Sequence, residues 1–294
     1  MKRPNFFILG APKCGTTSLA AWLAEHSRIY MSPLKEPHFF NTDEIREIAT
    51  LDAYEGLFRH ATTDHIAVGE ASVWYLASTD AVANIEAYDP QSRYIVLLRN
   101  PIDMAPSLHE QVVFGGAEPV TDFAQAWALQ HERRAGRNLP KAALPPMRLI
   151  YADACRLGAQ LQRLYRTVPR HRVLILMLED LHADAADAYA RVLSFLDVPH
   201  DGRTSFPVHN AAKTRAMPGV AKTVMAASHR FKSALGIHRQ FGIFSRIDEA
   251  TSVRRERESL PPALRQEIAD HFADDITRLG ALIERDLSHW LKQP

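Results

Sequence analysis

The chain has 294 residues, 46% of them hydrophobic, which is enough to bury a large core as one α/β domain, with or without a helical appendage. Its 35 Lys and Arg residues nearly balance its 34 Asp and Glu residues, which argues against a protein that coats nucleic acid or binds a membrane surface. The cysteines are Cys14 and Cys155, which offer neither a disulfide framework nor the spacing of metal ligands, so we expect no metal site.

The N-terminus is positively charged but is followed by only a short apolar run. Lys2 and Arg3 come first, and the apolar run spans Phe6 to Leu9 before Gly10. Such a run is too short for a signal peptide or a membrane span. We therefore expect a cytoplasmic protein without stable membrane insertion.

Short apolar runs alternate with helical patterns along the chain. Asn5 to Leu9 has the pattern of a buried strand, and Thr16 to Glu25 has that of the helix after it. The same order is predicted three more times. The strands are Ile66 to Val68, Tyr94 to Leu98 and Val173 to Leu178. The helices that follow them are Asp80 to Tyr88, Pro101 to Phe114 and Asp184 to Leu196. This alternation predicts an α/β fold with a doubly wound parallel β-sheet flanked by helices.

Three further helices are predicted at Thr121 to Arg137, Asp153 to Arg166 and Ala263 to Asp286. The proline-rich loop 138–147 is too short to divide domains. We therefore expect a single domain, 1–294, that ends in a helical segment.

A glycine-rich loop lies between the first strand and the first helix. Its sequence, GAPKCGTT from Gly10, has the glycine spacing of a phosphate-binding loop. A nucleoside-triphosphate loop has lysine directly after the second glycine, whereas Lys13 lies two places before Gly15. This disfavours magnesium-dependent γ-phosphate chemistry and suits a lysine that meets the oxygen bridging a 5′-phosphate to a further group. The alternative is a turn before an ordinary helix.

Two motifs resemble the PAPS-dependent sulfotransferase family, in particular bacterial members and the sulfotransferase domains of heparan-sulfate biosynthesis. The run APKCGTTSL at positions 11 to 19 is similar to the family's 5′-phosphosulfate loop. The run from Tyr94 to Ser107 (YIVLLRNPIDMAPS) is similar to a second motif, a strand ending in Arg followed by a helix with Ser eight residues later. The resemblance implies a P-loop-like fold, 3′-phosphoadenosine 5′-phosphosulfate (PAPS) as co-substrate, its bisphosphate (PAP) as product, and no metal.

The resemblance also assigns donor contacts to residues of both motifs. Those of the loop are Lys13, Cys14, Gly15, Thr16, Thr17 and Ser18, and those for the 3′-phosphate are Arg99 and Ser107. An arginine at the C-terminal end of a parallel strand points into the crevice where ligands bind, and its planar fork suits a phosphate. The alternative for Arg99 is a pair with a buried carboxylate.

The run KEPHFF from Lys35 resembles a third family segment, which carries the base that takes the acceptor proton. By position that base is Glu36. His38 is the competing base or a substrate-orienting partner, because two residues on in an extended segment it faces the same side. His109 is a further candidate, and Glu36 and His38 could each instead be a surface charge.

On the leaving side, Lys13 would neutralise charge on the bridging oxygen as the S–O bond breaks in a single in-line displacement. Glu70 lies in a segment, GEAS, that resembles the Glu-Lys-Thr/Ser segment of the heparan enzymes. Ala71 replaces the lysine used there, which puts contacts to an anionic polysaccharide through that position in doubt.

Residues 202–247 contain no Asp or Glu but eight Lys and Arg residues, so we expect this stretch to face an anion. Lys213 and Arg215 occupy the place of a family loop that closes over the donor. Segment 216–257 is a candidate acceptor-side lid. The alternative for the basic stretch is a solvated surface balanced by acidic neighbours such as Glu179, Asp180, Asp184 and Asp187. The alternative for the lid is that its Met and Phe residues are plain helix-packing positions.

The resemblance implies that the acceptor is a hydroxyl or amine of a carbohydrate or small-molecule natural product. We expect no nucleic-acid partner. The residues do not indicate an oligomeric state. A nucleotide-kinase-type phosphotransferase is the main alternative, since the run LILMLED from Leu174 has the pattern of a strand that ends in magnesium-holding carboxylates. A further alternative is a nucleotide-binding protein without catalytic activity. The presence of both Glu36 and His38 argues against it.

Overall fold

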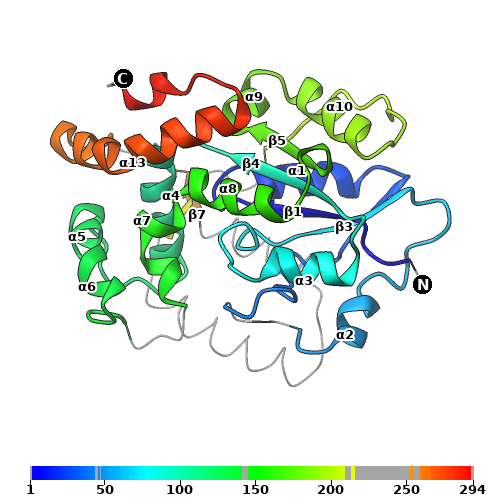
Figure 1. The fold of residues 1–294 in the computed structure, drawn as a ribbon, viewed down its shortest axis with the longest axis horizontal. Helices are drawn as coiled ribbons and strands as arrows, with labels where there is room; N and C mark the ends of the chain where they lie inside the picture. Colours follow the sequence, from blue (N-terminus) through cyan, green and yellow to red (C-terminus); the bar gives the residue numbers. More distant parts are fainter. Residues whose placement is uncertain are drawn as a thin grey trace.

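A five-stranded parallel sheet forms the centre of the structure, with strand order β2-β3-β1-β4-β5 (Figure 1). The computed structural model describes residues 2–43, 46, 48–140, 145–208, 213–215, 252–254 and 259–292. The five strands are β1 (Phe6–Gly10), β2 (Ile29–Met31), β3 (Ala67–Ala71), β4 (Arg93–Leu98) and β5 (Val173–Met177). The predicted parallel sheet is therefore confirmed.

The central strand, β1, is buried along its whole length. Its sequence, FFILG, is continuously apolar, as expected for a parallel strand that is covered on both faces. Phe6 lies opposite Gly69 of β3 on one side and opposite Arg93 of β4 on the other. A Cβ on Gly69 would come within 2.4 Å of the Phe6 ring, so the glycine makes room for that ring.

Helices cover both faces of the sheet. α1 and α10 pack on one face and α3 and α8 on the other, with α13 lying along α8 (Figure 1). The α-helices of the described residues are α1 (Thr16–Ala24), α2 (Leu51–Gly56), α3 (Ala81–Tyr88), α4 (Pro101–Phe114), α5 (Phe123–Ala128), α6 (Gln130–Arg134), α7 (Tyr151–Ala154), α8 (Leu157–Thr167), α9 (Leu178–Ala183), α10 (Ala185–Phe195) and α13 (Pro262–Ile283). Short 3-10 turns lie at η1 (Pro146–Leu149), η2 (Arg170–Arg172) and η3 (Ser288–Leu291).

A buried carboxylate joins the two packed helices α13 and α8. Asp275 of α13 accepts hydrogen bonds from the N–H groups of Gly158 and Ala159, at 2.8 and 2.9 Å, in the first turn of α8. A Cβ on Gly158 would lie 2.3 Å from the carbonyl oxygen of Asp275, so only glycine allows this approach. The C-terminal helix is thereby fixed to the helix that covers the sheet.

Several predicted boundaries differ from those of the structure. The helix predicted at 121–137 is divided into α5 and α6 at Leu129, and the one at 153–166 is divided into α7 and α8. The short elements β2 and α2 were not predicted. β5 ends at Met177, so the carboxylates of Glu179 and Asp180 belong to α9 rather than to a strand end.

A second, two-stranded sheet pairs β6 (Lys213–Arg215) with β7 (Ser252–Arg254) in antiparallel register, Lys213 opposite Arg254. The rest of segment 216–257 lies outside the described residues, so the lid stays a prediction, as does the single-domain organisation.

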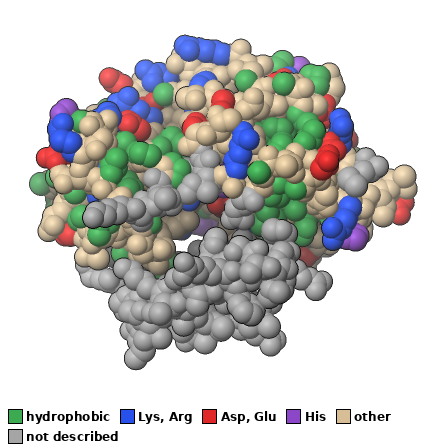
Figure 2. Space-filling model, turned by 90° about the horizontal axis from the view of Figure 1, so that it is seen from below, with side chains coloured by type: hydrophobic (Ala, Val, Ile, Leu, Met, Phe, Trp, Pro, Cys, Tyr) green, Lys and Arg blue, Asp and Glu red, His purple; other side chains and the backbone are tan. Residues whose placement is uncertain are grey.

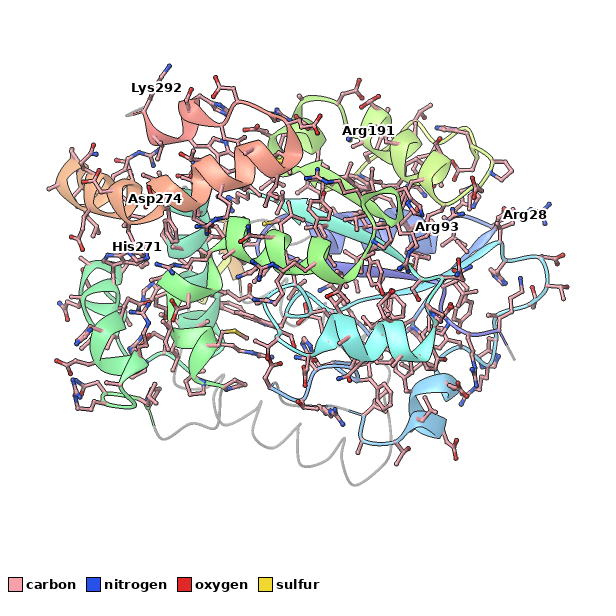
Figure 3. The ribbon with its side chains drawn as sticks, in the orientation of Figure 1. Arg28, Arg93, Arg191, His271, Asp274 and Lys292 are labelled. Atoms are coloured by element: carbon pink, nitrogen blue, oxygen red, sulfur yellow. The ribbon has the colours of Figure 1, made fainter. Side chains whose placement is uncertain are left out.

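Charged side chains of both signs are interspersed on the face seen in Figure 2. Arg28, Arg191 and Lys292, labelled in Figure 3, are exposed. Of the helices in the described part of the chain, none has the length and apolarity needed to cross a bilayer.

Candidate active site

The segments that follow three neighbouring strands meet at the C-terminal edge of the sheet. After β1, Ala11 N–H donates to the carbonyl oxygen of Leu97 in β4 at 2.8 Å. After β3, Ser72 N–H donates to the carbonyl oxygen of Ile8 in β1 at 3.1 Å. The phosphate-loop motif and the arginine motif are thus brought together, as expected for a ligand site of a doubly wound sheet.

The glycine-rich loop turns tightly against the segment after β3. Gly10 has φ +132°, and a Cβ there would lie 2.3 Å from the carbonyl oxygen of Val73. Gly15 has φ +88° and ends the loop. Lys13, half-buried between them, has φ 64°, a left-handed conformation that non-glycine residues rarely adopt. Such conformations cluster at functional sites, where the surrounding structure holds them in place.

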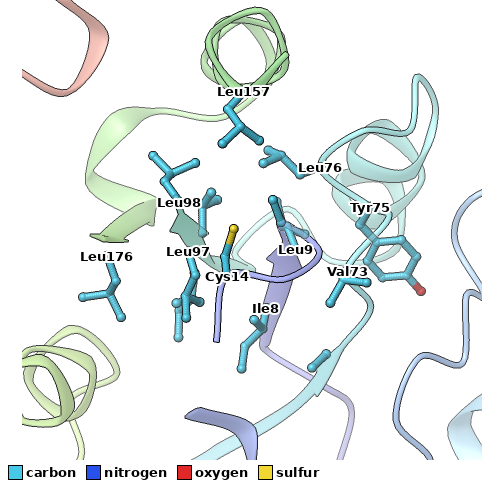
Figure 4. Packing of buried hydrophobic residues seen from close by; sticks show 14 of the residues in the cluster. Ile8, Leu9, Cys14, Val73, Tyr75, Leu76, Leu97, Leu98, Leu157 and Leu176 are labelled. Atoms are coloured by element: carbon cyan, nitrogen blue, oxygen red, sulfur yellow. The ribbon is translucent and has the colours of Figure 1, made fainter. Parts of the chain in front are cut away.

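The side chain of Cys14 points into the core rather than into the crevice. It is fully buried in the hydrophobic cluster, and its sulfur points to the side on which Leu9, Leu98 and Leu157 lie (Figure 4). Burial raises the pKa of the Cys14 thiol to about 12, although Arg99 lowers it in part. A ligand contact from Cys14 is therefore limited to its backbone N–H.

The N-terminus of α1 has the features of an anion site. Gly15 precedes the helix and has no side chain that could cap the N–H groups of its first turn. Thr16 and Ser18 are buried there and Thr17 is half-buried. Uncapped N–H groups and the positive end of the helix dipole favour a phosphate, so the loop residues fit a 5′-phosphate group.

Arg99 connects the two motifs directly. Its Nη1 donates a hydrogen bond to the carbonyl oxygen of Lys13 at 3.2 Å. The next residues begin α4, where the Asn100 side chain accepts from Ile102 N–H and Pro101 is the first helical residue. Ser107 is buried on the same helix. The arginine is thus held against the loop.

Glu36 lies beside Lys35 and His38. The backbone N–H of Glu36 donates to the carbonyl oxygen of Ala71 at 2.9 Å, which fixes it to the end of β3. Its carboxylate pairs with Lys35, and its Oε2 lies 3.6 Å from Nε2 of His38. Burial acts to raise the pKa of Glu36, but Lys35 and His38 outweigh it and lower the pKa to about 2.

The extended conformation predicted for the segment that carries Glu36 and His38 is wrong. The segment is not extended, because Glu36 has φ 61° and His38 has φ 49°. The two side chains nevertheless lie together. The His38 ring is buried, and neither ring nitrogen makes a hydrogen bond to another described residue.

The other sequence candidates have different surroundings. His109 is buried on α4, and its Nε2 lies 2.8 Å from the carbonyl oxygen of Val120. Glu179 and Asp180 both pair with Arg285, which removes the support for a magnesium-holding strand end. Among the described residues, no group of three or more His, Cys, Asp or Glu could hold a metal ion.

The basic stretch is described only in part. Arg203 pairs with Glu25 at 2.6 Å. Lys213 and Arg215 lie in β6, whose backbone alone is described.

Glu70 was noted in the sequence for the GEAS segment that contains it, but no role was predicted for it. It is fully buried at the end of β3, and burial raises its pKa to about 6. Three hydroxyl groups donate to its carboxylate, from Tyr54, Ser72 and Tyr75. The signal available in the sequence was a glutamate inside the apolar run AVGEA.

Known proteins match the chain over most of its length. The family model described as sulfotransferase domain matches residues 3–223. A solved sulfotransferase from Alicyclobacillus acidocaldarius is similar over 99% of this chain and 100% of its own, with 28% sequence identity and a TM-score of 0.73.

Two curated relatives match shorter stretches. Heparan sulfate glucosamine 3-O-sulfotransferase 6 of Mus musculus is 28% identical over 196 residues, 66% of this chain and 52% of that protein. Carbohydrate sulfotransferase 15 of Homo sapiens is 29% identical over 143 residues, 34% of this chain and 26% of that protein. The chain thus covers about half or less of these relatives' length.

Proposed function

Because the chain belongs to the sulfotransferase domain family, we propose that it transfers the sulfuryl group of PAPS to a hydroxyl or amine of a carbohydrate or small-molecule acceptor. The observation that carries the proposal is the hydrogen bond from Arg99 to the carbonyl oxygen of Lys13. It joins the two donor motifs at the edge of the sheet where the Glu36 segment is also attached.

The loop and Arg99 form the donor half of the proposed site. Backbone N–H groups at the start of α1, with the Thr16, Thr17 and Ser18 side chains, hold the 5′-phosphosulfate. Arg99 and Ser107 hold the 3′-phosphate, where a guanidinium makes charge-assisted hydrogen bonds. Lys213 and Arg215 add contacts to the donor.

The acceptor half supplies the base. The acceptor oxygen or nitrogen attacks sulfur, and the bond from sulfur to the bridging oxygen breaks. The electron pair of that bond leaves on the 5′-phosphate of PAP, beside Lys13, while the acceptor proton passes to Glu36. His38, whose ring nitrogens lack a hydrogen-bond partner among the described residues, orients the acceptor.

The names of the curated relatives put glycans first among acceptors to be screened. One relative is a heparan sulfate glucosamine 3-O-sulfotransferase and another a carbohydrate sulfotransferase. Ala71 has no charge with which to bind an anionic polysaccharide. Neutral sugars and glycosylated small molecules therefore belong in the screen beside sulfated chains.

Isothermal titration with PAP and with ATP tests the donor assignment. The expected result is that PAP binds without magnesium and ATP binds weakly. Labelled PAPS with pooled acceptors then tests transfer. Tight ATP binding that requires magnesium, together with phosphate transfer, would instead favour the kinase-type alternative.

Glu36→Gln tests the base. We expect the rate of transfer to fall by about 10²–10⁴, the usual contribution of general-base catalysis, with PAP affinity unchanged. His38→Gln is the matched comparison, because it removes the neighbouring ring and leaves the carboxylate. An active Glu36→Gln enzyme beside an inactive His38→Gln enzyme would assign the proton transfer to His38.

A further inference from the structure

Glu70 is attached to the base-bearing segment by two hydroxyl groups. The first belongs to Ser72, whose Oγ donates to Oε2 of Glu70 at 2.7 Å and accepts from the backbone N–H of His38 at 3.3 Å. A hydroxyl has one proton, so the bond to the carboxylate turns its lone pairs toward the N–H of His38.

The second hydroxyl belongs to Tyr75. It donates to Oε1 of Glu70 at 2.9 Å and accepts from the backbone N–H of Phe40 at 3.2 Å. One buried carboxylate thus orients the two acceptors that receive the N–H groups of residues 38 and 40.

Segment 36–40 needs such external support. Glu36 and His38 both have left-handed backbone conformations, which their side chains disfavour. The segment belongs to none of the strands and helices. Besides the bond from Glu36 N–H to the carbonyl oxygen of Ala71, the backbone N–H groups of His38 and Phe40 are bonded to Ser72 and Tyr75.

We propose that Glu70 is a positioning residue for the transfer reaction: through Ser72 and Tyr75 it fixes the backbone of residues 36–40, and so the places of the Glu36 carboxylate and the His38 ring. This inference rests on the proposed function, because the reaction is the one assigned to Glu36. Glu70 itself is fully buried and acts through its neighbours.

A carboxylate suits this task better than an amide. An ionised carboxylate only accepts hydrogen bonds, so every hydroxyl around it must donate and present its lone pairs outward. An amide would direct N–H groups at one of the hydroxyls and turn it around. The pKa of Glu70, about 6, leaves the group ionised at neutral pH.

Tyr54 provides a matched control. Its hydroxyl also donates to Oε1 of Glu70, at 3.2 Å, but among the described residues it accepts no hydrogen bond from an N–H of segment 36–40. Its ring stacks on Phe39 at 4.5 Å, and Tyr54→Phe keeps that contact. Tyr54→Phe therefore removes a bond to the carboxylate without removing an acceptor from the segment.

The experiment compares Ser72→Ala and Tyr75→Phe with Tyr54→Phe. The first two are expected to lower kcat by about 10²-fold, the cost of a small misplacement of catalytic groups, with KM for PAPS and Kd for PAP unchanged. Tyr54→Phe is expected to stay within about twofold of wild type, and Ser72→Thr, which keeps the hydroxyl, to recover most of the loss in Ser72→Ala.

Backbone hydrogen exchange of the peptide that contains residues 36–41 gives a readout independent of activity. Faster exchange is expected in Ser72→Ala, Tyr75→Phe and Glu70→Gln but not in Tyr54→Phe. Equal exchange and equal kcat in Tyr54→Phe and the other variants would overturn the role of Glu70. If the wild-type protein failed to bind PAP, only the proposed function would be contradicted. The exchange comparison would still decide whether Glu70 holds segment 36–40.

Discussion

The pKa values of Glu36 and Glu70 are displaced in opposite directions. Both carboxylates belong to the surroundings of segment 36–40, because Glu36 lies in it and Glu70 is bonded to it through the hydroxyl groups of Ser72 and Tyr75. The pKa of Glu36 is lowered to about 2, since Lys35 and His38 outweigh its burial. The pKa of Glu70 is raised to about 6, since burial outweighs the hydroxyl groups around it. Separated pKa values of this kind are typical of groups with different roles in one site.

The Lys35 pair keeps Glu36 ionised but makes it a weak base, because a base works best when its pKa is near the operating pH. Lys35→Met removes the larger of the two charges that lower this pKa. We expect the pKa of Glu36 to rise and the acid limb of the kcat profile to move to higher pH.

A pH profile of kcat from about pH 3 to 9 tests this shift: wild type should stay active to the acid end, and Lys35→Met should lose activity as pH falls into the ordinary carboxyl range of about 4. Lys292→Met, which removes an exposed lysine at the periphery (Figure 3), is the control. Superimposable acid limbs for wild type and Lys35→Met would show that Lys35 does not tune the base.

Glu70 makes folding stability depend on pH. Its pKa is higher in the folded protein than the ordinary value of 4.5, so the folded state binds the proton more tightly. The stability from this group is therefore full below pH 4.5 and is lost as pH rises through about 6. The loss is on the order of 2 kcal/mol, since one pKa unit corresponds to about 1.36 kcal/mol.

Glu70→Gln removes this titration. Urea unfolding at several pH values should show the wild type losing stability relative to Glu70→Gln between pH 4.5 and 6. Tyr54 and Tyr75 face the carboxylate with pKa values well above 10, so they stay protonated over this range. Parallel stability curves would contradict the prediction.

At the scale of elements, a buried ion pair ties α6 to the segment after α4. Arg133 binds Glu118 through both terminal nitrogens, at 2.6 and 2.9 Å, and Tyr151 of α7 donates to the same carboxylate at 2.8 Å. Both charged side chains are almost fully buried. The pair therefore holds α6 and α7 against the segment between α4 and α5.

Arg133→Met leaves the Glu118 charge buried without its partner. We expect the free energy of unfolding to fall by about 3–5 kcal/mol, the usual cost of breaking such a pair. The double variant Arg133→Met with Glu118→Leu should recover much of the loss, because no charge is then buried. Chemical denaturation measures both, and a double variant as unstable as the single one would count against this explanation.

Local signals were sufficient for the long elements. α4 spans Pro101–Phe114 as predicted, because Asn100 caps it and Pro101 starts it. β2 was missed because its three residues carry too little pattern. β5 ends at Met177, one residue before the predicted end, and Glu179 and Asp180 in the helix that follows both pair with Arg285.

The candidate site was predictable in its residues but not in its geometry. Lys13, Arg99 and Glu36 stand at recognisable spacings, and the structure brings the first two into contact. The left-handed backbone at Glu36 and His38 follows from bonds to the segment after β3, which residue type does not indicate. The role of Glu70 depends likewise on hydroxyl groups that only the fold assembles.

At the scale of the whole molecule, donor binding should stabilise the fold. A ligand at about 100 times its Kd adds about 2.7 kcal/mol to the free energy of unfolding. We expect PAP at that ratio to raise Tm by several degrees. Arg99→Ala should weaken PAP binding by about 1.5–3 kcal/mol, the range of a charge-assisted hydrogen bond, and so remove half or more of the shift at the same concentration.

Thermal scans with PAP and with ATP measure the effect, and ATP without magnesium is the control. An undiminished shift in Arg99→Ala would mean that the 3′-phosphate lies elsewhere.

The position of β1 in the middle of the sheet has a consequence for synthesis. The ribosome makes this strand first, but its neighbours β3 and β4 follow only at residues 67–71 and 93–98. At about 5–20 residues per second, β1 waits on the order of 5–20 s before β4 emerges. Until then its run of phenylalanine, isoleucine and leucine lacks at least one of its two partner strands, which makes it a natural target for chaperones that shield newly made chains.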